Sequence, residues 1–487
     1  MRKRKLAIIM AAAVTISAIA GACSTGEQKT EPQKTESQST ESQNTYVKDG
    51  ETTAEGTAQN NNQGNSGSES DKNYNNTYDV AGAGEVKLDV MITSLGDSDG
   101  GPYLRSVMDN YMNMYPNVTL NPVECSMNDL YTTLITQATA GTLPDIFTMT
   151  EAYSANCAEM EMNISNLDQL LGEEYLNGLM EVAIENATVD GQLVYMPWQN
   201  NITAMVYRKD LFEEKGIDIP KTWDEFLEAA KLLTEDIDGD GRIDRYGAAF
   251  AGTRNDSAES RFQTFALTFG SDFITANGDG TYTSGFGTEQ FKNAMTSFIN
   301  LAAKEEIAPP GFIETGYSEA YTMIAADQAC MFFSASNVLG GIYNANPELR
   351  GKMGSFPMPT ANGVDPVTSF SSVGMTISNT CKNPEVAADF LKYMTSVENT
   401  VEWNEATCRL PVVKEALDAI CENDSAYTGF AESSDSAVIY PAFAGLAELR
   451  DICGECWQTV VSEGVSIDDA IATAATKAEE AAKSYSN

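Results

Sequence analysis

The sequence predicts an α/β fold with a parallel sheet, and the succession of strand-like and helix-like segments is the main reason. Apolar residues alternate over residues 86–92, as in a half-buried strand, and recur at helical spacing over 104–115. A second strand and helix follow over 118–120 and 130–138, and a third strand covers 146–149. Strands that are joined by helices pair in parallel, so this order predicts a parallel sheet.

Two residues mark the ends of these helices, and the loops beyond the strands mark the place for a ligand. Pro116 ends the first helix because it has no backbone N–H, and Gly141 ends the second because glycine readily adopts the left-handed conformation.

In open α/β sheets, ligands bind at the carboxyl ends of the strands. We therefore expect a ligand near residues 93–102 and 148–154.

The composition favours a binding protein over a catalyst. The 487 residues include 70 Asp and Glu against 30 Lys and Arg, a formal charge of -40 at pH 7. This argues against a nucleic-acid partner, because phosphates require a basic surface. The absence of histidine excludes imidazole as a base, an acid or a metal ligand. The length predicts roughly two or three domain-sized units.

The first residues predict export. An apolar run over 6–20 follows a basic start and is too short to span a membrane, so residues 1–22 are predicted to be a signal peptide. The small residues before Cys23 resemble a bacterial lipobox, which implies that Cys23 is lipidated, although Ala20 stands where that motif usually has Leu. The alternative is ordinary cleavage near Ala22, with no role for the cysteine.

Residues 23–84 are predicted to be a disordered linker that begins at the lipidated cysteine. Between residues 24 and 76 only five residues are apolar or aromatic, so this stretch cannot bury enough apolar surface to offset the entropy of ordering. A chain of this length has an r.m.s. reach of about 40 Å, which suits a tether between a membrane and a folded domain. The leader of a secreted protein without a lipid is the alternative.

Three segments in the middle of the chain carry a family resemblance. Residues 191–198 read Gly-Gln-Leu-Val-Tyr-Met-Pro-Trp, residues 205–212 read Met-Val-Tyr-Arg-Lys-Asp-Leu-Phe, and residues 219–226 read Ile-Pro-Lys-Thr-Trp-Asp-Glu-Phe. Their order and spacing resemble the sugar-type extracellular solute-binding proteins of bacterial ABC importers, which are relatives of maltose-binding protein. Arg208 replaces the Asn that is usual in that family.

The last of these segments also predicts a local structure without the family. Thr222 and Glu225 have the spacing of a capping box at the start of a helix. Apolar side chains then recur at helical spacing through Leu233 and form a buried face. Trp223 is therefore predicted to be structural.

The resemblance extends over residues 85–487 and implies a fold of two α/β lobes joined by a hinge, with a ligand cleft between them. Closure of the lobes around the ligand presents a new surface to the permease. Lobe one is expected to contain residues 85–200 and 373–408, and lobe two residues 201–372 and 409–487. The chain is expected to cross between the lobes near residues 198–206, 367–375 and 405–412.

The candidate ligand-binding residues are those that suit a sugar in such a cleft. A sugar ring needs an aromatic face, and its hydroxyls need amide, carboxylate or guanidinium partners. Trp198 and the three amides after it fit best, so Trp198→Ala is expected to abolish sugar affinity and to leave the melting temperature nearly unchanged. The alternative is that the indole packs between the lobes or in a core. For the three charged candidates, a solvated surface or a pair within one lobe is the alternative. The full set is Trp198, Gln199, Asn200, Asn201, Glu151, Arg254, Ser334, Asn337, Tyr440, Phe443 and Arg409.

One loop carries the oxygen pattern of an EF-hand calcium site. Carboxylates occupy its positions 1, 3, 5 and 9, glycine occupies position 6, and position 7 offers a backbone carbonyl. Gly247 stands at position 12, where such loops usually carry a bidentate Glu. A structural calcium ion is the one cofactor we expect, and a turn without an ion is the alternative. The candidate ligands are Asp236, Asp238, Asp240, Arg242 and Asp244.

These observations predict a lipid-anchored, monomeric substrate-binding subunit of an ABC importer at the extracellular face of a bacterial cell membrane. It captures a sugar or an oligosaccharide, delivers it to the permease subunits, and is neither an enzyme nor a nucleic-acid-binding protein. Two alternatives stay open: an exported carbohydrate-active enzyme with paired carboxylates, and a lipoprotein that senses a ligand for a membrane kinase. Two carboxyl groups roughly 5–10 Å apart across a sugar cleft would favour the enzyme.

Overall fold

The computed structural model describes residue 74, residues 78–441 and residues 443–486. The predicted signal peptide over residues 1–22, Cys23 and most of the predicted linker lie outside the described residues. The described part has the two-lobed α/β fold that the sequence predicted, and each lobe has its own sheet and its own hydrophobic core.

The first lobe is built on a six-stranded sheet, and the predicted parallel strands form one half of it. β1 lies between β2 and β3 and pairs in parallel with both. β13 runs antiparallel to β3 and to β6, because it returns from the second lobe and not through a crossover helix. In order across the sheet, the strands are β14 (Leu410–Pro411), β6 (Met196–Asn200), β13 (Ser372–Ile377), β3 (Ile146–Thr150), β1 (Val86–Met91) and β2 (Val118–Val123).

Residues at or next to the ends of the first two long helices of this lobe determine where these helices begin and end. The Asp99 carboxylate accepts the first amide N–H of α2 (Gly100–Met114), and Pro116 follows the end of that helix. Gly141 ends α3 (Leu130–Ala140) with a φ of 68°, as predicted. The other elements of this lobe are α4 (Glu151–Glu159), α5 (Leu167–Leu171), α6 (Glu173–Asn177), α7 (Glu181–Asn186), β4 (Thr188–Val189), β5 (Gln192–Leu193), α14 (Pro384–Met394) and α15 (Val397–Thr407).

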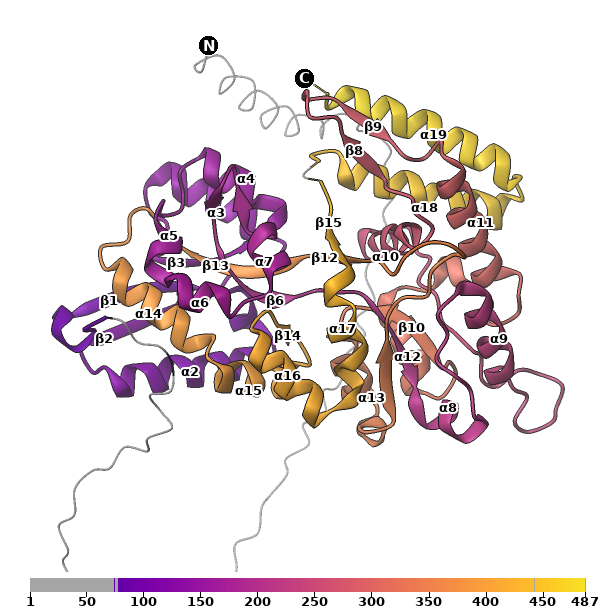
Figure 1. Cartoon of the computed structure of the whole chain (residues 1–487), viewed down its shortest axis with the longest axis horizontal. Helices are drawn as coiled ribbons and strands as arrows, with labels where there is room; N and C mark the ends of the chain where they lie inside the picture. The colour runs from indigo at the N-terminus through magenta and orange to yellow at the C-terminus, as the bar shows by residue number, and fades with distance from the viewer. Residues whose placement is uncertain (1–73, 75–77, 442, 487) are drawn as a thin grey trace, which may run out of the picture. The chain divides into compact units, whose positions relative to one another are not determined.

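The second lobe is built on a three-stranded antiparallel sheet with β7 at its centre. Its strands are β10 (Met331–Ser334), β7 (Ala204–Arg208) and β11 (Met353–Phe356), and a hairpin of β8 (Ile274–Ala276) and β9 (Tyr282–Ser284) stands apart from them. Its helices are α8 (Lys209–Lys215), α9 (Trp223–Leu233), α10 (Asp256–Leu267), α11 (Glu289–Ala303), α12 (Tyr317–Ala325), α13 (Val338–Ala345), α16 (Lys414–Asn423), α17 (Thr428–Glu432), α18 (Leu446–Glu463) and α19 (Ile467–Ser484). Figure 1 shows β10 among α8, α9 and α12, and α18 beside α19.

The capping box predicted for α9 is confirmed. Thr222 accepts the backbone N–H of Glu225, and the Glu225 carboxylate accepts the N–H of Thr222. Trp223 is buried, and its indole N–H donates to the Thr268 hydroxyl at 2.8 Å, so its role is structural as predicted.

The chain connects the two sheets at two places, each within a range where a crossing was expected. Residues 201–203 lead from β6 directly into β7. β12 (Thr368–Phe370) pairs in parallel with β15 (Ala437–Ile439) immediately before β13 joins the first sheet. A small separate core beside these connections contains Leu179, Ile202, Phe370 and Val412. The exact lobe boundaries stay a prediction.

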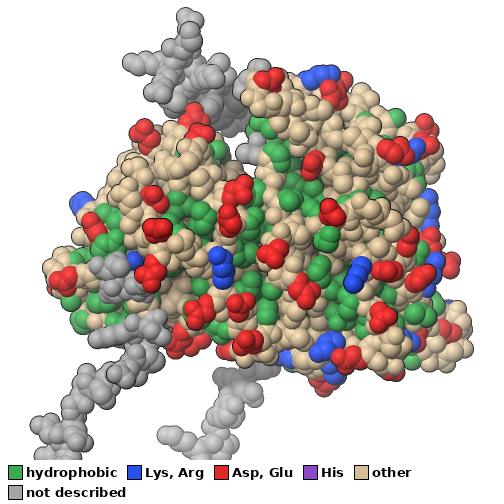
Figure 2. Space-filling model, in the orientation of Figure 1, with side chains coloured by type: hydrophobic (Ala, Val, Ile, Leu, Met, Phe, Trp, Pro, Cys, Tyr) green, Lys and Arg blue, Asp and Glu red, His purple; other side chains and the backbone are tan. Residues whose placement is uncertain are grey.

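The surface reflects the composition. Acidic side chains are spread over the face drawn in Figure 2, and basic side chains are fewer. Among the helices of residues 78–441 and 443–486, none combines the length and the apolar character needed to cross a membrane. The eight cysteines of the described part are free thiols.

Candidate functional site

A cavity of about 550 Å³ lies at the carboxyl ends of β1 and β2 and extends to the second lobe. We call it the interlobe cavity, because Asn337, which follows β10 of the second lobe, forms part of its wall. The strand order predicted this position, since loops gather at the carboxyl ends of strands. The lining residues are Thr93, Ser94, Gly96, Asp97, Glu124, Cys125, Ser126, Met127, Gln199, Asn201, Asn337, Val373 and Arg409.

Polar groups dominate this wall. It carries hydroxyl, amide, carboxylate and guanidinium side chains, with Met127 and Val373 as apolar members. Such groups can donate hydrogen bonds to sugar hydroxyls and accept hydrogen bonds from them. The structure brings together four of the eleven predicted ligand-binding residues in this wall, namely Gln199, Asn201, Asn337 and Arg409.

The amides that follow Trp198 take different positions. Gln199 is 6% exposed, and its buried Nε2 has no hydrogen-bond partner within the described part of the chain. Asn201 donates from Nδ2 to the Ser371 hydroxyl at 3.4 Å. Asn200 instead donates to the carbonyl of Pro411 at 2.7 Å, which ties β6 to β14. Alternation along the strand therefore points Gln199 and Asn201 toward the cavity and Asn200 away from it.

Trp198 packs in the core of the first lobe and does not line the interlobe cavity. It is 2% exposed, and its ring centroid lies 4.6 Å from that of Trp403 in α15. This is the alternative position that the sequence left open. The local pattern could not distinguish the two positions, because Trp403 is 205 residues away in the chain.

Both carboxylates of the cavity wall are paired with arginines. Arg409 donates from Nη2 to Asp97 at 3.0 Å, and its guanidinium lies 5.5 Å from the Trp403 ring centroid. Arg105 pairs with Glu124 at the end of β2. Both carboxylates of the wall are therefore already bound by guanidinium groups.

Two predicted residues of the second lobe belong to a network behind Asn337. Ser334, at the end of β10, is buried and accepts a hydrogen bond from Arg261 at 2.9 Å. Asn337 donates from Nδ2 to the Tyr317 hydroxyl at 3.4 Å, and the Arg261 guanidinium lies 4.1 Å from the centroid of that ring. The sequence analysis missed Arg261 and Tyr317, because neither stands at the end of a predicted strand.

The other predicted residues lie outside the lining of the cavity. Glu151 is partly buried in the first turn of α4, and burial raises the pKa of its carboxyl group. Arg254 forms a bidentate pair with Asp451 at 2.7 Å, which matches the alternative of a pair within one lobe. Tyr440 is partly buried, and Phe443 packs in the core of the second lobe.

The sequence analysis also missed the residues that follow β1 and β2. Asp97 follows a short 3-10 helix (Thr93–Gly96) at the end of β1, inside the loop that was expected to hold a ligand. The segment from Glu124 to Met127 follows β2, and its position after a predicted strand was the signal that could have found it. The loop at 148–154 instead forms the end of β3 and the start of α4.

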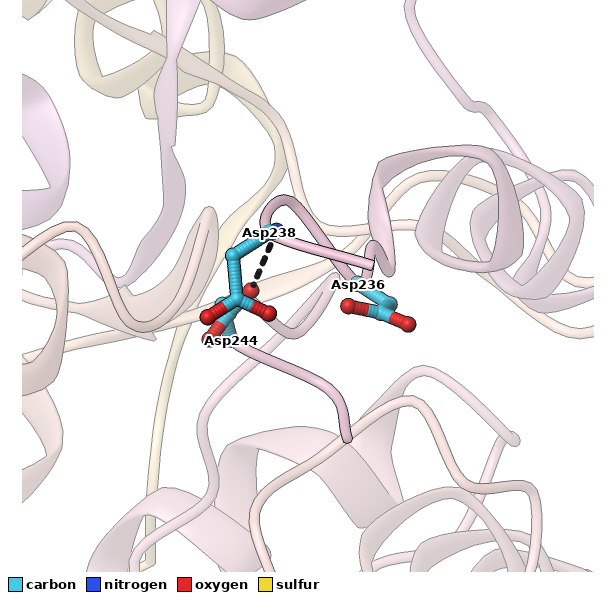
Figure 3. A group of neighbouring side chains, drawn as sticks. All are labelled: Asp236, Asp238 and Asp244. Carbon is cyan, nitrogen blue, oxygen red and sulfur yellow. Dashed lines mark hydrogen bonds between the residues drawn. The ribbon is translucent and has the colours of Figure 1, made fainter. Parts of the chain in front are cut away.

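The predicted calcium loop brings three of its carboxylates together. Carboxylate oxygens of Asp236, Asp238 and Asp244 lie within 4.8 Å of one another, and all three residues are exposed (Figure 3). Asp236 accepts the amides of Gly239 and Gly241 at 2.8 Å, and Asp244 accepts that of Asp238 at 3.2 Å. The carboxylate of Asp240 lies outside this group and accepts the amide of Arg242 at 2.8 Å.

The comparisons with known proteins agree with this architecture. A protein of Brucella abortus that is described as a binding protein is 24% identical over 405 residues, which are 82% of this chain and 93% of that protein. The multiple sugar-binding protein of Streptococcus mutans is 25% identical over 281 residues, which are 56% of this chain and 63% of that protein. The structure of the sugar-binding protein MalE from Xanthomonas citri is similar with a TM-score of 0.69 at 17% identity, over 82% of this chain and 98% of that one.

The family itself follows from a match over most of the folded part. The model for bacterial extracellular solute-binding proteins matches residues 96–401, which is more than half of the chain. The protein belongs to the bacterial extracellular solute-binding proteins, a family of binding proteins and not of enzymes.

Proposed function

We propose that this protein is the substrate-binding subunit of an ABC importer and that it binds a sugar or an oligosaccharide in the interlobe cavity. The observation that carries the proposal is the polar wall to which both lobes contribute, with Gln199 and Asn201 on one side and Asn337 on the other. A ligand that bridges these amides stabilises the closed arrangement of the lobes and so signals occupancy to the permease.

Some of the predicted residues contact the ligand, and the others support the structure around the cavity. Gln199, Asn201, Asn337 and Arg409 bind ligand hydroxyls, while Trp198 holds Arg409 indirectly through Trp403. The remaining members of the predicted set support the structure around the cavity and do not contact the ligand. Asn200 and Ser334 form hydrogen bonds inside their lobes, and Arg254 joins the start of α10 to α18. Glu151 lies at the start of α4, and Tyr440 and Phe443 lie within the second lobe. The lobes follow the bounds expected from the sequence, 85–200 with 373–408 and 201–372 with 409–487, except that Ser372 and β14 belong to the first lobe because they pair in its sheet.

The arrangement of carboxylates supports binding over hydrolysis. A glycosidase needs one carboxyl group that can act as an acid and another that is free to act as a base or nucleophile. The two carboxylates of the cavity wall, Asp97 and Glu124, are each engaged by an arginine. The names of the Streptococcus mutans and Xanthomonas citri proteins, both sugar-binding, further support a carbohydrate ligand.

The N-terminal region supplies the anchor in this proposal. Residues 1–22 are removed on export, Cys23 carries the lipid, and the linker holds the monomer at the extracellular face of the membrane, within reach of the permease. Tyr74, near the end of the linker, donates to the Asp389 carboxylate at 2.7 Å and so joins the linker to α14. Labelling of cells with a radioactive fatty acid tests this part: the label is expected on the natural protein and not on Cys23→Ser.

The Asp236–Asp244 loop binds a structural calcium ion in this proposal. The sequence pattern and the approach of three carboxylates support it, whereas the missing Glu at position 12 requires another oxygen, such as water. The ion has no part in sugar binding, because the loop is not part of the cavity wall.

Binding is tested by a thermal-shift screen of the purified protein against mono- and oligosaccharides. A true ligand at 100 times Kd adds about 2.7 kcal/mol to the free energy of unfolding. Gln199→Ala and Asn337→Ala, one from each lobe, are expected to weaken binding of the best sugar about tenfold by loss of one hydrogen bond. Asn277→Ala, an exposed amide in the β8–β9 hairpin, is the control and should have no effect. A screen in which no sugar raises the melting temperature, or in which the sugar is chemically converted, contradicts the proposal.

A further inference from the structure

Arg261 differs from the other arginines of the described chain because it combines a buried nitrogen that has no partner with the absence of any ion pair to a carboxylate. The described residues include nine arginines, of which six form ion pairs with Asp or Glu: Arg105, Arg208, Arg245, Arg254, Arg409 and Arg450. Arg242 and Arg350 are exposed. Arg261 is partly buried, and its Nε has no hydrogen-bond partner among the described residues.

The groups around the Arg261 guanidinium are neutral. Nη1 donates to the carbonyl and the hydroxyl of Ser257 at 2.5 and 2.8 Å, and Nη2 donates to the Ser334 hydroxyl at 2.9 Å. The Tyr317 ring covers one face of the guanidinium at 4.1 Å. Asp256 is the nearby acid on the same helix, but its carboxylate is bound by Arg450 at 2.7 Å. The positive charge of Arg261 therefore has no counterion of its own.

A cation in such a place is unfavourable unless an anion joins it. Removing a charge from water costs several kcal/mol, which only an opposite charge with good hydrogen bonds offsets. Burial lowers the pKa of Arg261, whereas the hydrogen bond to Asp451 raises the pKa of Arg254. The protein thus holds Arg261 in a position that a bound anion would stabilise.

The geometry of the free edge indicates which anion fits. Arg208 and Arg254 each bind one carboxylate with two parallel bonds, from Nε and from Nη2. Arg261 retains its Nε hydrogen and one of the two hydrogens of Nη2, because the Ser334 hydroxyl accepts only the other. A planar carboxylate matches this pair of donors.

Arg261 lies behind Asn337 in the wall of the interlobe cavity, with Tyr317 between them. Asn337 lines the cavity and donates to the Tyr317 hydroxyl, whose ring covers Arg261. That hydrogen bond is 3.4 Å long and therefore weak, so movement of the Asn337 amide toward a ligand costs little. A ligand carboxylate that reaches Arg261 from the cavity has to pass the Asn337 amide and the Tyr317 hydroxyl.

Building on the proposed sugar-binding function, we infer that Arg261 binds a carboxylate of the ligand and that the ligand is an acidic oligosaccharide containing a uronic acid. The neutral part of the sugar contacts the amides of Gln199 and Asn201, and the carboxylate forms two hydrogen bonds with Nε and Nη2 of Arg261. The two wall carboxylates, Asp97 and Glu124, are each paired with arginine, so neither places an unpaired negative charge in the cavity wall.

Isothermal titration of the purified protein tests the inference with matched sugars. The probes are oligogalacturonates and oligoglucuronates, their fully methyl-esterified forms, sulfated oligosaccharides and neutral malto-oligosaccharides. The natural protein is expected to bind one of the uronates at least tenfold more tightly than its uncharged methyl ester. Arg261→Gln is expected to reduce uronate affinity about 10- to 100-fold and to change the affinity for the methyl ester less than threefold.

The controls separate the loss of a charge from the loss of this site. Arg350→Gln removes another guanidinium that lies over a tyrosine ring, Tyr343 at 4.6 Å, but outside the cavity wall, and should leave both affinities unchanged. Arg261→Lys keeps the charge without the two-pronged edge, so an intermediate loss of uronate affinity is expected. It also replaces Arg261→Gln if that variant fails to fold, as judged by its circular dichroism.

The outcomes distinguish this inference from the proposed function. Equal affinity for acid and ester, or an equal effect of Arg261→Gln on both, overturns the inference and leaves sugar binding intact. Binding of sulfated sugars alone, with the same dependence on Arg261, overturns the assignment to a carboxylate. Failure of every sugar to bind overturns the inference and the proposed function together.

Discussion

The Arg409 guanidinium donates a hydrogen bond to Asp97 at 3.0 Å and so joins the loop after β1 to the segment that enters β14. The two residues are 312 positions apart in the chain, and both line the interlobe cavity. Arg409 also lies over Trp403, which packs on Trp198. The Arg409–Asp97 ion pair in the cavity wall therefore contacts the aromatic core of the first lobe through the Trp403 ring.

Arg409→Met is expected to weaken binding of the best sugar about tenfold, because a charged donor in the cavity wall is lost. The free energy of unfolding should change by no more than about 1 kcal/mol, because both partners are partly exposed to solvent. Titration calorimetry and urea denaturation measure the two effects. Arg254→Met breaks a similar pair outside the cavity and serves as the control. Equal affinity of the two variants would argue against a role for Arg409.

Trp198→Ala is expected to destabilise the first lobe by about 3–5 kcal/mol, because it removes a large side chain from a packed core. The indole is 2% exposed and contacts Trp403, which argues against the expectation from the sequence that the melting temperature stays nearly unchanged. Trp198→Phe keeps an aromatic ring and should lose much less stability. Thermal denaturation followed by circular dichroism distinguishes the variants. A melting temperature of Trp198→Ala equal to that of the natural protein would place the indole outside the core.

The buried carboxyl group of Glu259 predicts that stability falls as pH rises. Burial, with the nearby charges of Asp451 and Asp256, raises its pKa from 4.5 to about 7. An acid whose pKa is raised in the folded state binds its proton more tightly there, so its contribution to stability is lost as the pH rises from about 4.5 to about 7.

Glu259→Gln is neutral at every pH and should therefore melt higher than the natural protein at pH 8, with little difference at pH 4.5. The measurement is a melting curve at each pH. Glu463→Gln changes an exposed residue at the end of α18 and should show no such pH-dependent difference. A difference for Glu259→Gln that is the same at both pH values would contradict the assignment.

Gly374→Ala is expected to destabilise the protein by at least about 2 kcal/mol, because the interior of the first sheet has no room for a methyl group. A Cβ at this position would lie 2.0 Å from the Met196 carbonyl oxygen, and backbone in the neighbouring strand cannot move aside. Gly287→Ala has open space around it and is the matched control. The midpoints of urea denaturation should differ accordingly, and equal midpoints would refute the predicted clash.

Calcium is expected to raise the melting temperature of the natural protein. It should not raise that of the double variant in which Asp238→Asn and Asp244→Asn are combined. The ion would relieve repulsion among three carboxylates that lie within 4.8 Å of one another. Melting curves with EDTA, with calcium and with magnesium provide the measurement. Asp424→Asn, a change at a helix cap far along the chain, is the control. An identical response of the natural protein and the double variant would show that the loop is an ion-free turn.

The sequence alone determined the elements that depend on near neighbours. The capping box of Thr222 and Glu225, the end of α3 at Gly141 and the parallel pairing of β1 with β2 follow from signals within a few residues or within one strand–helix–strand unit. The three motif segments that marked the family belong to the same class, because their order along the chain is itself the signal. For this reason the fold and the family could be predicted without the structure.

Only the tertiary structure decided which side chains form the site. Alternation along the strand places Trp198 and its neighbour Gln199 on opposite faces, but no local pattern shows which of them lies in the core with Trp403 and which lines the cavity. The pairing of Asp97 with Arg409 and the uncompensated charge of Arg261 depend on segments that are distant in sequence. Local propensity acts over a few residues, whereas burial and charge compensation depend on which segments the fold brings together. The residues of the candidate site could therefore be identified only from the tertiary structure.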